Sequence, residues 1–137
     1  MRSAVATVAF LLVSAGAAVA DDAPFAGDVV YGTEAGCTWL ATRSYPGTED
    51  TMVVTRDYMR GYESICHFVD MKQGVHEDLF VSAICYGEGE MWPATYALAL
   101  DPDSGALVMT SQGGSVGGDL AACPDVTTAI ADEITGE

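Results

Sequence analysis

Basic side chains are scarce in this sequence: five lysines and arginines stand against 20 aspartates and glutamates in 137 residues, which gives a formal net charge of −15 at pH 7. Such a surface repels the phosphates of nucleic acids and of anionic membranes. We therefore expect no nucleic-acid partner. The same charge attracts cationic proteins, peptides or divalent metals, although an exported protein can carry it for solubility alone.

Cysteine pairs at redox or zinc spacing are also missing. The four cysteines stand at positions 37, 66, 85 and 123, and no two of them form a C-x-x-C motif. This argues against a thioredoxin-type redox centre and against a zinc ribbon. His76, Glu77 and Asp78 are ligand-type residues, but zinc requires three or four ligands that converge from rigid positions. We expect no metal and no cofactor.

Two short segments match the sequence patterns of functional motifs but lack the neighbouring residues and elements that those motifs require. The G-x-S-x-G pattern at 113–117 would need a following helix and a later histidine, whereas glycine follows it and both His67 and His76 precede it. The D-x-D-x-G pattern that starts at Asp101 resembles the opening of a calcium loop, but Gln112 stands where that loop needs a glutamate. We interpret the two patterns as a loop and a hairpin turn.

Carboxylates remain as candidates for acid–base chemistry. Glu63, Glu88 and Glu90 could supply a pair of the kind used in glycoside hydrolysis, but spacing alone does not place two of them across a cleft. The interpretation that we prefer has no catalytic residue. The alternative is a small periplasmic hydrolase or metal-dependent enzyme that uses carboxylates with His67 or His76.

The N-terminus has the features of a cleavable export signal. Arg2 supplies a positive charge, residues 4–17 are mostly apolar, and small residues at 18 and 20 precede a cleavage site. Arg2 is the only charged residue removed, so the mature chain has a formal net charge of −16. We expect residues 21–137 to form a single disulfide-stapled β domain in the periplasm or outside the cell, without a membrane span.

Alternation of apolar and polar residues dominates the mature chain and predicts strands joined by short turns. The fold class that follows is all-β: a small antiparallel meander, either a barrel or a sandwich, with disulfides and a short C-terminal helix. A closed barrel is preferred because closure removes exposed strand edges. The predicted strands are residues 28–31, 38–42, 51–55, 62–69, 78–86, 90–100 and 106–111.

The remaining segments are predicted as turns, loops or short helices. Residues 56–61 are expected to form a helical turn, and residues 119–123 another. The glycine-rich residues 113–118 are expected to form a flexible loop. Asp125 is expected to cap the C-terminal helix.

An even number of cysteines in an exported chain predicts disulfides, and three pairings are possible. Cys66 and Cys85 lie on the two arms of a predicted hairpin that turns near Gly74, both on the face expected to be inward. Their distances from the turn, eight and eleven positions, differ, so pairing them requires a small register offset or a bulge. We favour Cys66–Cys85 with Cys37–Cys123, and a Cys37–Cys66 bond would exclude this pairing.

Residues 85–92 form the most distinctive segment. Its two glycines allow a sharp turn beside a cysteine. In a structural interpretation, Trp92 closes one end of the core. In a functional one, Tyr86, Glu88, Glu90 and Trp92 form an acidic, aromatic-edged lip that binds a cationic partner.

A resemblance rests on three motifs: G-Y-E-S-x-C at 61–66, C-x-G-E-G-E-x-W at 85–92, and D-x-x-S-G-x-L at 101–107, followed by Cys123. In this order they resemble small exported bacterial proteins of unassigned function, alphaproteobacterial ones among them. The resemblance spans roughly residues 36–124 and implies no activity.

The function we expect is therefore that of a non-catalytic exported β domain that binds a protein or a small ligand. A cationic protein or peptide is the expected partner class, and an inhibitor-like role fits the same physical description. A purely structural component of the cell envelope is a further possibility.

Overall fold

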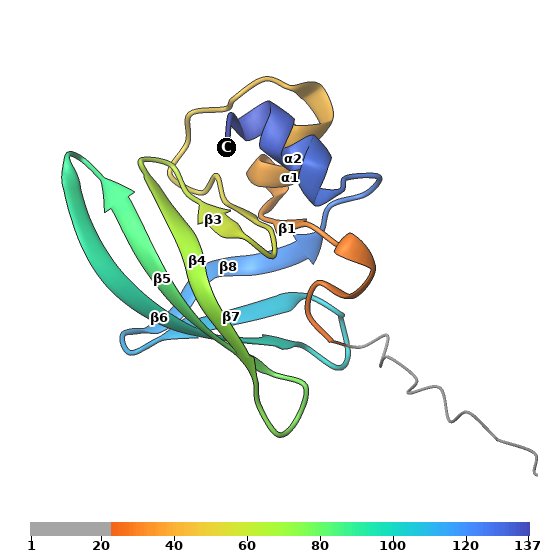
Figure 1. Ribbon diagram of the computed structural model, residues 1–137. Coiled ribbons are helices and arrows are strands. Elements are labelled where there is room, and N and C mark those ends of the chain that lie inside the picture. Colours follow the sequence, from red (N-terminus) through yellow and green to blue (C-terminus); the bar gives the residue numbers. More distant parts are fainter. Residues whose placement is uncertain (1–22) are drawn as a thin grey trace, which may run out of the picture.

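A computed structural model describes residues 23–137, and in it the chain forms a closed antiparallel β-barrel (Figure 1). The predicted signal segment, residues 1–20, lies outside the described residues. Each strand pairs with the next along the chain, and the last pairs with the first, so the all-β prediction is confirmed as a barrel. The strands are β1 (Tyr31–Gly32), β2 (Val53–Val54), β3 (Tyr58–Arg60), β4 (Ser64–Gln73), β5 (Leu79–Gly87), β6 (Glu90–Leu100), β7 (Leu107–Ser111) and β8 (Gly114–Ala122).

The barrel interior is filled by inward-facing side chains. On β5 the two-residue alternation holds as predicted: Val81, Ala83 and Cys85 are buried, while the residues between them are half-buried or exposed. Inward residues of the other strands pack against these in one apolar cluster, which includes Leu98 and Leu120, both fully buried. Burial of this alternating set is the main term that stabilises the barrel.

Two helices cover the outside of the barrel where the strands are shortest. α1 (Glu34–Thr42) and α2 (Thr128–Thr135) lie side by side there (Figure 1). Beneath them a second apolar cluster joins Trp39 and Leu40 of α1 to Val53 of β2 and Ala131 of α2. The expected C-terminal helix is thus present, but its N-cap is Thr127 and not Asp125.

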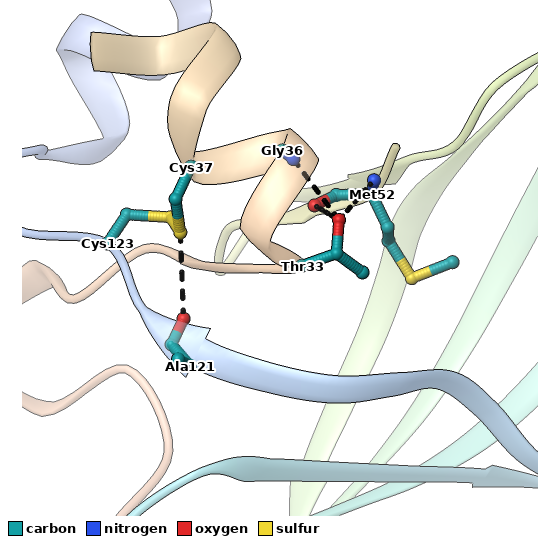
Figure 2. Close-up of a disulfide and its surroundings, with 6 residues drawn as sticks. All are labelled: Thr33, Gly36, Cys37, Met52, Ala121 and Cys123. Carbon is teal, nitrogen blue, oxygen red and sulfur yellow. Dashed lines mark hydrogen bonds between the residues drawn. A yellow bond between two sulfur atoms is a disulfide. The ribbon is translucent and has the colours of Figure 1, made fainter. Parts of the chain in front are cut away.

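The prediction of a strand at residues 38–42 was wrong, because this segment belongs to α1. The Thr33 hydroxyl accepts a hydrogen bond from the Gly36 N–H and so caps the helix. A Cβ at Gly36 would overlap the carbonyl oxygen of Met52, so only glycine lets the helix approach β2 this closely (Figure 2). Tertiary contact therefore overrides the β-rich composition of the segment.

Residues 56–61 were also predicted wrongly, since β3 replaces the expected helical turn. The Thr55 hydroxyl accepts hydrogen bonds from the N–H groups of Asp57 and Tyr58, and this closes a tight connection between β2 and β3. Tyr58 and Met59 are buried on opposite faces of the strand, Tyr58 under α2 and Met59 in the barrel interior.

The glycine-rich segment at 113–118 and residues 119–123 were expected to form a loop and a helical turn, but both contribute to β8. The strand pairs with β7 on one side and with β1 on the other. Gly117 has a positive φ of 80°, and the Met52 sulfur occupies the space that its side chain would take. Glycine here permits a close approach within a strand and does not indicate a loop.

The disulfides are those favoured from the hairpin argument. Cys66 and Cys85 are directly opposite each other on β4 and β5, and the required register shift lies between Phe68 and Asp70. Cys37 of α1 bonds to Cys123, which follows β8 (Figure 2). No cysteine of the described part of the chain is free.

Candidate binding site at the β5–β6 hairpin

A tight turn at Glu88 and Gly89 joins β5 to β6 and forms the tip of a long hairpin (Figure 1). Both residues have positive φ, 50° and 82°, as a two-residue type I′ turn requires. The strands remain paired up to Gly87 and Glu90, next to the turn. The hairpin is therefore regular to its end, and it holds its side chains on fixed faces.

The strand faces divide the four residues of the predicted lip. Trp92 is directly opposite the buried Cys85 and lies on the inward face, whereas Tyr86 is opposite Met91 and lies on the outward face. The Tyr86 ring is 6.1 Å from the ring of His67, which also faces outward. The structure thus keeps Trp92 beside the turn glutamates and places Tyr86 on the other side of the sheet.

A hollow of about 470 Å³ lies on the inward side of the hairpin tip. Three carboxylates border it: Glu88 in the turn, Glu90 at the start of β6, and Glu63 just before β4. Trp92 forms a wall with 39% of its surface exposed, so it borders the hollow and does not close the core as the structural interpretation expected. The lining residues are Glu63, Ser64, Gly87, Glu88, Glu90 and Trp92.

Tyr96, not Trp92, is the aromatic residue buried beneath this end of the barrel. Its hydroxyl lies 3.5 Å from the Cys66 sulfur and 3.6 Å from the Cys85 sulfur. Burial raises the pKa of Tyr96 above its ordinary value of about 10, so the phenol stays neutral to higher pH than an exposed tyrosine does. The Tyr96 ring and the Cys66–Cys85 disulfide thus form an uncharged, rigid floor beneath the glutamates of the hollow.

A second hollow, of about 430 Å³, runs along β6 on the side away from β5. It is bounded by residues 92–96 and by the turn between β7 and β8 at residues 111–113. Trp92 borders both hollows. This groove was missed from the sequence, although Pro93 inside a predicted strand is a signal for a strand edge, where a missing N–H is tolerated.

The residues of the alternative, catalytic interpretation are assembled only in part, because Glu63, Glu88 and Glu90 line the tip hollow but neither histidine does. His67 lies on the outward face with Nε2 3.7 Å from Glu137 Oε2, away from the three glutamates of the tip hollow. His76 is exposed in the loop between β4 and β5, where its backbone N–H donates to Asp78 Oδ1. Within residues 23–137 no three histidine, cysteine, aspartate or glutamate side chains are grouped as a metal site requires.

The two motif matches have structural explanations. Ser115 of the G-x-S-x-G pattern is an exposed residue of β8. Asp101 Oδ1 accepts hydrogen bonds from the N–H groups of Asp103 and Ser104 and from the Ser104 hydroxyl, which lowers the pKa of the Asp101 carboxyl. Its role is to hold the turn between β6 and β7.

Comparisons with known protein families, with curated proteins and with solved structures find no match to this chain. Fold and site alone therefore define the class: a small eight-stranded antiparallel β-barrel with two disulfides and an acidic hollow at one hairpin tip. None of the helices in the described region is long and apolar enough to span a membrane.

Proposed function

We propose that this protein is an exported, non-catalytic β-barrel that binds a cationic protein or peptide at the β5–β6 hairpin tip. The observation that supports this most is the convergence of Glu63, Glu88 and Glu90 with the exposed indole of Trp92 around one hollow. Carboxylates attract lysine and arginine, and an indole face adds a favourable contact with either cation.

The compartment proposed here is the periplasm or the extracellular space. The N-terminal sequence has the order of a cleavable export signal. Disulfides such as the two in this barrel persist mainly in oxidising compartments. The formal net charge of −16 on the mature chain steers cationic partners toward the protein over distances of about a Debye length, roughly 8 Å at physiological salt.

Calorimetric titration with a lysine- and arginine-containing peptide at rising salt tests this function. We expect affinity to fall as salt rises, and the triple variant Glu63→Gln/Glu88→Gln/Glu90→Gln to lose about tenfold in affinity, because exposed ion pairs contribute up to about 1 kcal/mol each. The matched control is Glu49→Gln/Asp50→Asn/Asp119→Asn, which removes three exposed acidic groups elsewhere. Equal losses in both triples would reject the tip as the binding site.

A further inference from the structure

β6 is paired on both sides only along part of its length. It pairs with β5 from Glu90 to Leu98, but with β7 only from Ala97 to Leu100. β7 ends at Ser111, and the chain turns there into β8. Residues 91–96 therefore have no strand partner on the β7 side within the part of the chain that the structure describes.

The period of two along a strand identifies the backbone groups on this open edge. The Ala97 carbonyl accepts from the Thr110 hydroxyl, and the Asp101 N–H donates to the Ala106 carbonyl, so both residues turn their backbone groups toward β7. Alternate residues of an antiparallel strand face the same neighbour. The N–H groups of residues 91 and 95 and the carbonyls of residues 91, 93 and 95 consequently face the open side.

The open edge is accessible and borders the groove described above. Met91 is 66% exposed, and Pro93 and Thr95 are exposed as well. Pro93 has no N–H, which makes the edge a poor template for indiscriminate strand pairing. In Figure 1 the hairpin tip, at upper left, stands apart from the turn between β7 and β8, at lower left.

We propose that an extended, cationic segment of the partner binds as an additional strand along residues 91–95 of β6. This inference rests on the proposed function and adds the mode of binding. Charge complementarity determines the occupant, because Glu88 and Glu90 lie at the tip end of this edge and a second copy of the mature chain would bring a further net charge of −16. Five residues at about 3.3 Å each give an added strand of about 16 Å.

The two faces of β6 specify what the added strand should carry. Side chains that point inward would lie beside Trp92 and the half-buried Ala94, and those that point outward would lie beside Met91 and Thr95. A segment that alternates lysine or arginine with β-branched residues would place its cations near the glutamates on one face and would suit the extended, pleated backbone of a strand.

The probe is a capped heptapeptide that alternates lysine and valine, titrated by calorimetry. Thr95→Pro removes an N–H from the open edge, where proline is tolerated, while Thr95→Ala removes the same side chain and keeps the N–H. We expect Thr95→Pro to weaken binding at least tenfold and Thr95→Ala to change it less than twofold. The same peptide N-methylated at every residue, which blocks both strand edges, should bind at least tenfold more weakly.

Amide hydrogen exchange of the wild-type protein supplies a readout that needs no variant. Saturation with the lysine–valine peptide should slow exchange at residues 91 and 95 at least tenfold and leave exchange at Val75, an exposed loop residue, unchanged. This measurement decides the matter if Thr95→Pro does not fold.

The outcomes separate the two proposals. If the peptide binds with salt sensitivity but equally well to Thr95→Pro, or without protecting residues 91 and 95, the added strand is rejected and the proposed function stands. If wild-type protein binds neither cationic peptide, both are rejected. Sedimentation of the free protein as a dimer that Thr95→Pro dissociates would assign the edge to a second copy and overturn the inference.

Discussion

Tyr58 illustrates how one residue couples the barrel to its helical cover. Its side chain is 2% exposed, and its hydroxyl is 2.8 Å from the Thr135 hydroxyl in α2. Burial, together with the nearby carboxylates of Asp132 and Glu137, raises the pKa of Tyr58 to about 12. The folded protein therefore holds this proton more tightly than the unfolded chain does, in which tyrosine titrates near 10.

This difference predicts alkaline destabilisation. The contribution of Tyr58 is fully present below pH 10 and is lost as the pH rises through 12, and two pKa units correspond to about 3 kcal/mol. Tyr58→Phe should be about 1 kcal/mol less stable at pH 8, because a hydrogen bond is lost, but should lose less stability between pH 10 and 12. Urea unfolding at these pH values measures both, and identical losses in the two proteins would contradict the assignment.

Trp92 and Tyr86 show what was predictable for single residues. The alternation correctly assigned Trp92 to the inward face and Tyr86 to the face opposite Cys85. The exposure of Trp92 was not predictable, because it depends on where β7 ends, and no local pattern around Trp92 contains that information. The burial of Tyr96 beside the disulfide has the same non-local origin.

At the scale of elements, the seam between β1 and β8 that closes the barrel is short. β1 has two residues, and it pairs with β8 only at Tyr31–Ala122 and Gly32–Ala121. The Cys37–Cys123 bond lies beside these pairs, and the Cys37 sulfur is 3.9 Å from the Ala121 carbonyl oxygen (Figure 2). This disulfide holds α1 against the seam.

Removing that bond should loosen the seam before the rest of the barrel. The double variant Cys37→Ala/Cys123→Ala is expected to lose about 4 kcal/mol, since the bond closes a loop with a sequence separation of 86. Amide exchange should quicken first in β1 and at the end of β8, while β4 and β5 stay protected. The control is Cys66→Ala/Cys85→Ala, in which amide exchange in the seam should stay slow. If both variants instead exchanged faster only in β4 and β5, the Cys37–Cys123 bond would not be what stabilises the seam.

Elements that pair locally were predictable, and elements shaped by distant contacts were not. The hairpin arms at 62–69 and 78–86 alternate along their own sequence and pair with their chain neighbours. α1 depends on its close approach to Met52, and β8 depends on two partner strands and on Met52 beside Gly117. Composition alone indicated a strand for the first and a loop for the second.

At the scale of the whole molecule, acidic self-repulsion dominates the electrostatics. Only a few cations oppose it, and two of them, Arg43 and Arg60, pair with Glu133 and Glu137 at the C-terminal end. Repulsion among the remaining carboxylates destabilises the compact state and is screened by salt. Stability and partner binding should therefore respond to salt with opposite signs.

Thermal unfolding tests the stability half of this statement. Raising sodium chloride from roughly 10 to roughly 500 mM shortens the Debye length from about 30 Å to about 4 Å. This should raise Tm by a few degrees, which corresponds to about 1 kcal/mol of stability. The charge-reduced triple Glu49→Gln/Asp50→Asn/Asp119→Asn should gain less from salt than wild type. A Tm that falls with salt would show that attractive pairs, not repulsion, prevail.

Closure into a barrel was the preferred prediction, but the sequence could not exclude a sandwich. The decisive pairing, β1 with β8, joins segments at opposite ends of the described chain and involves two residues of each strand. So short a pairing has no detectable periodicity in the sequence. The cysteines supplied the best indirect signal, because pairing Cys66 with Cys85 left Cys37 and Cys123 to join the ends.

Chemical-shift mapping of the amide groups during titration with the lysine–valine peptide tests the central claim most directly. We predict that the shifted resonances belong to the tip of the β5–β6 hairpin, to the first half of β6 and to the turn between β7 and β8, with α1 and α2 unaffected. Shifts that concentrate on the helices, or that spread evenly over the acidic surface, would contradict a binding site at this end of the barrel.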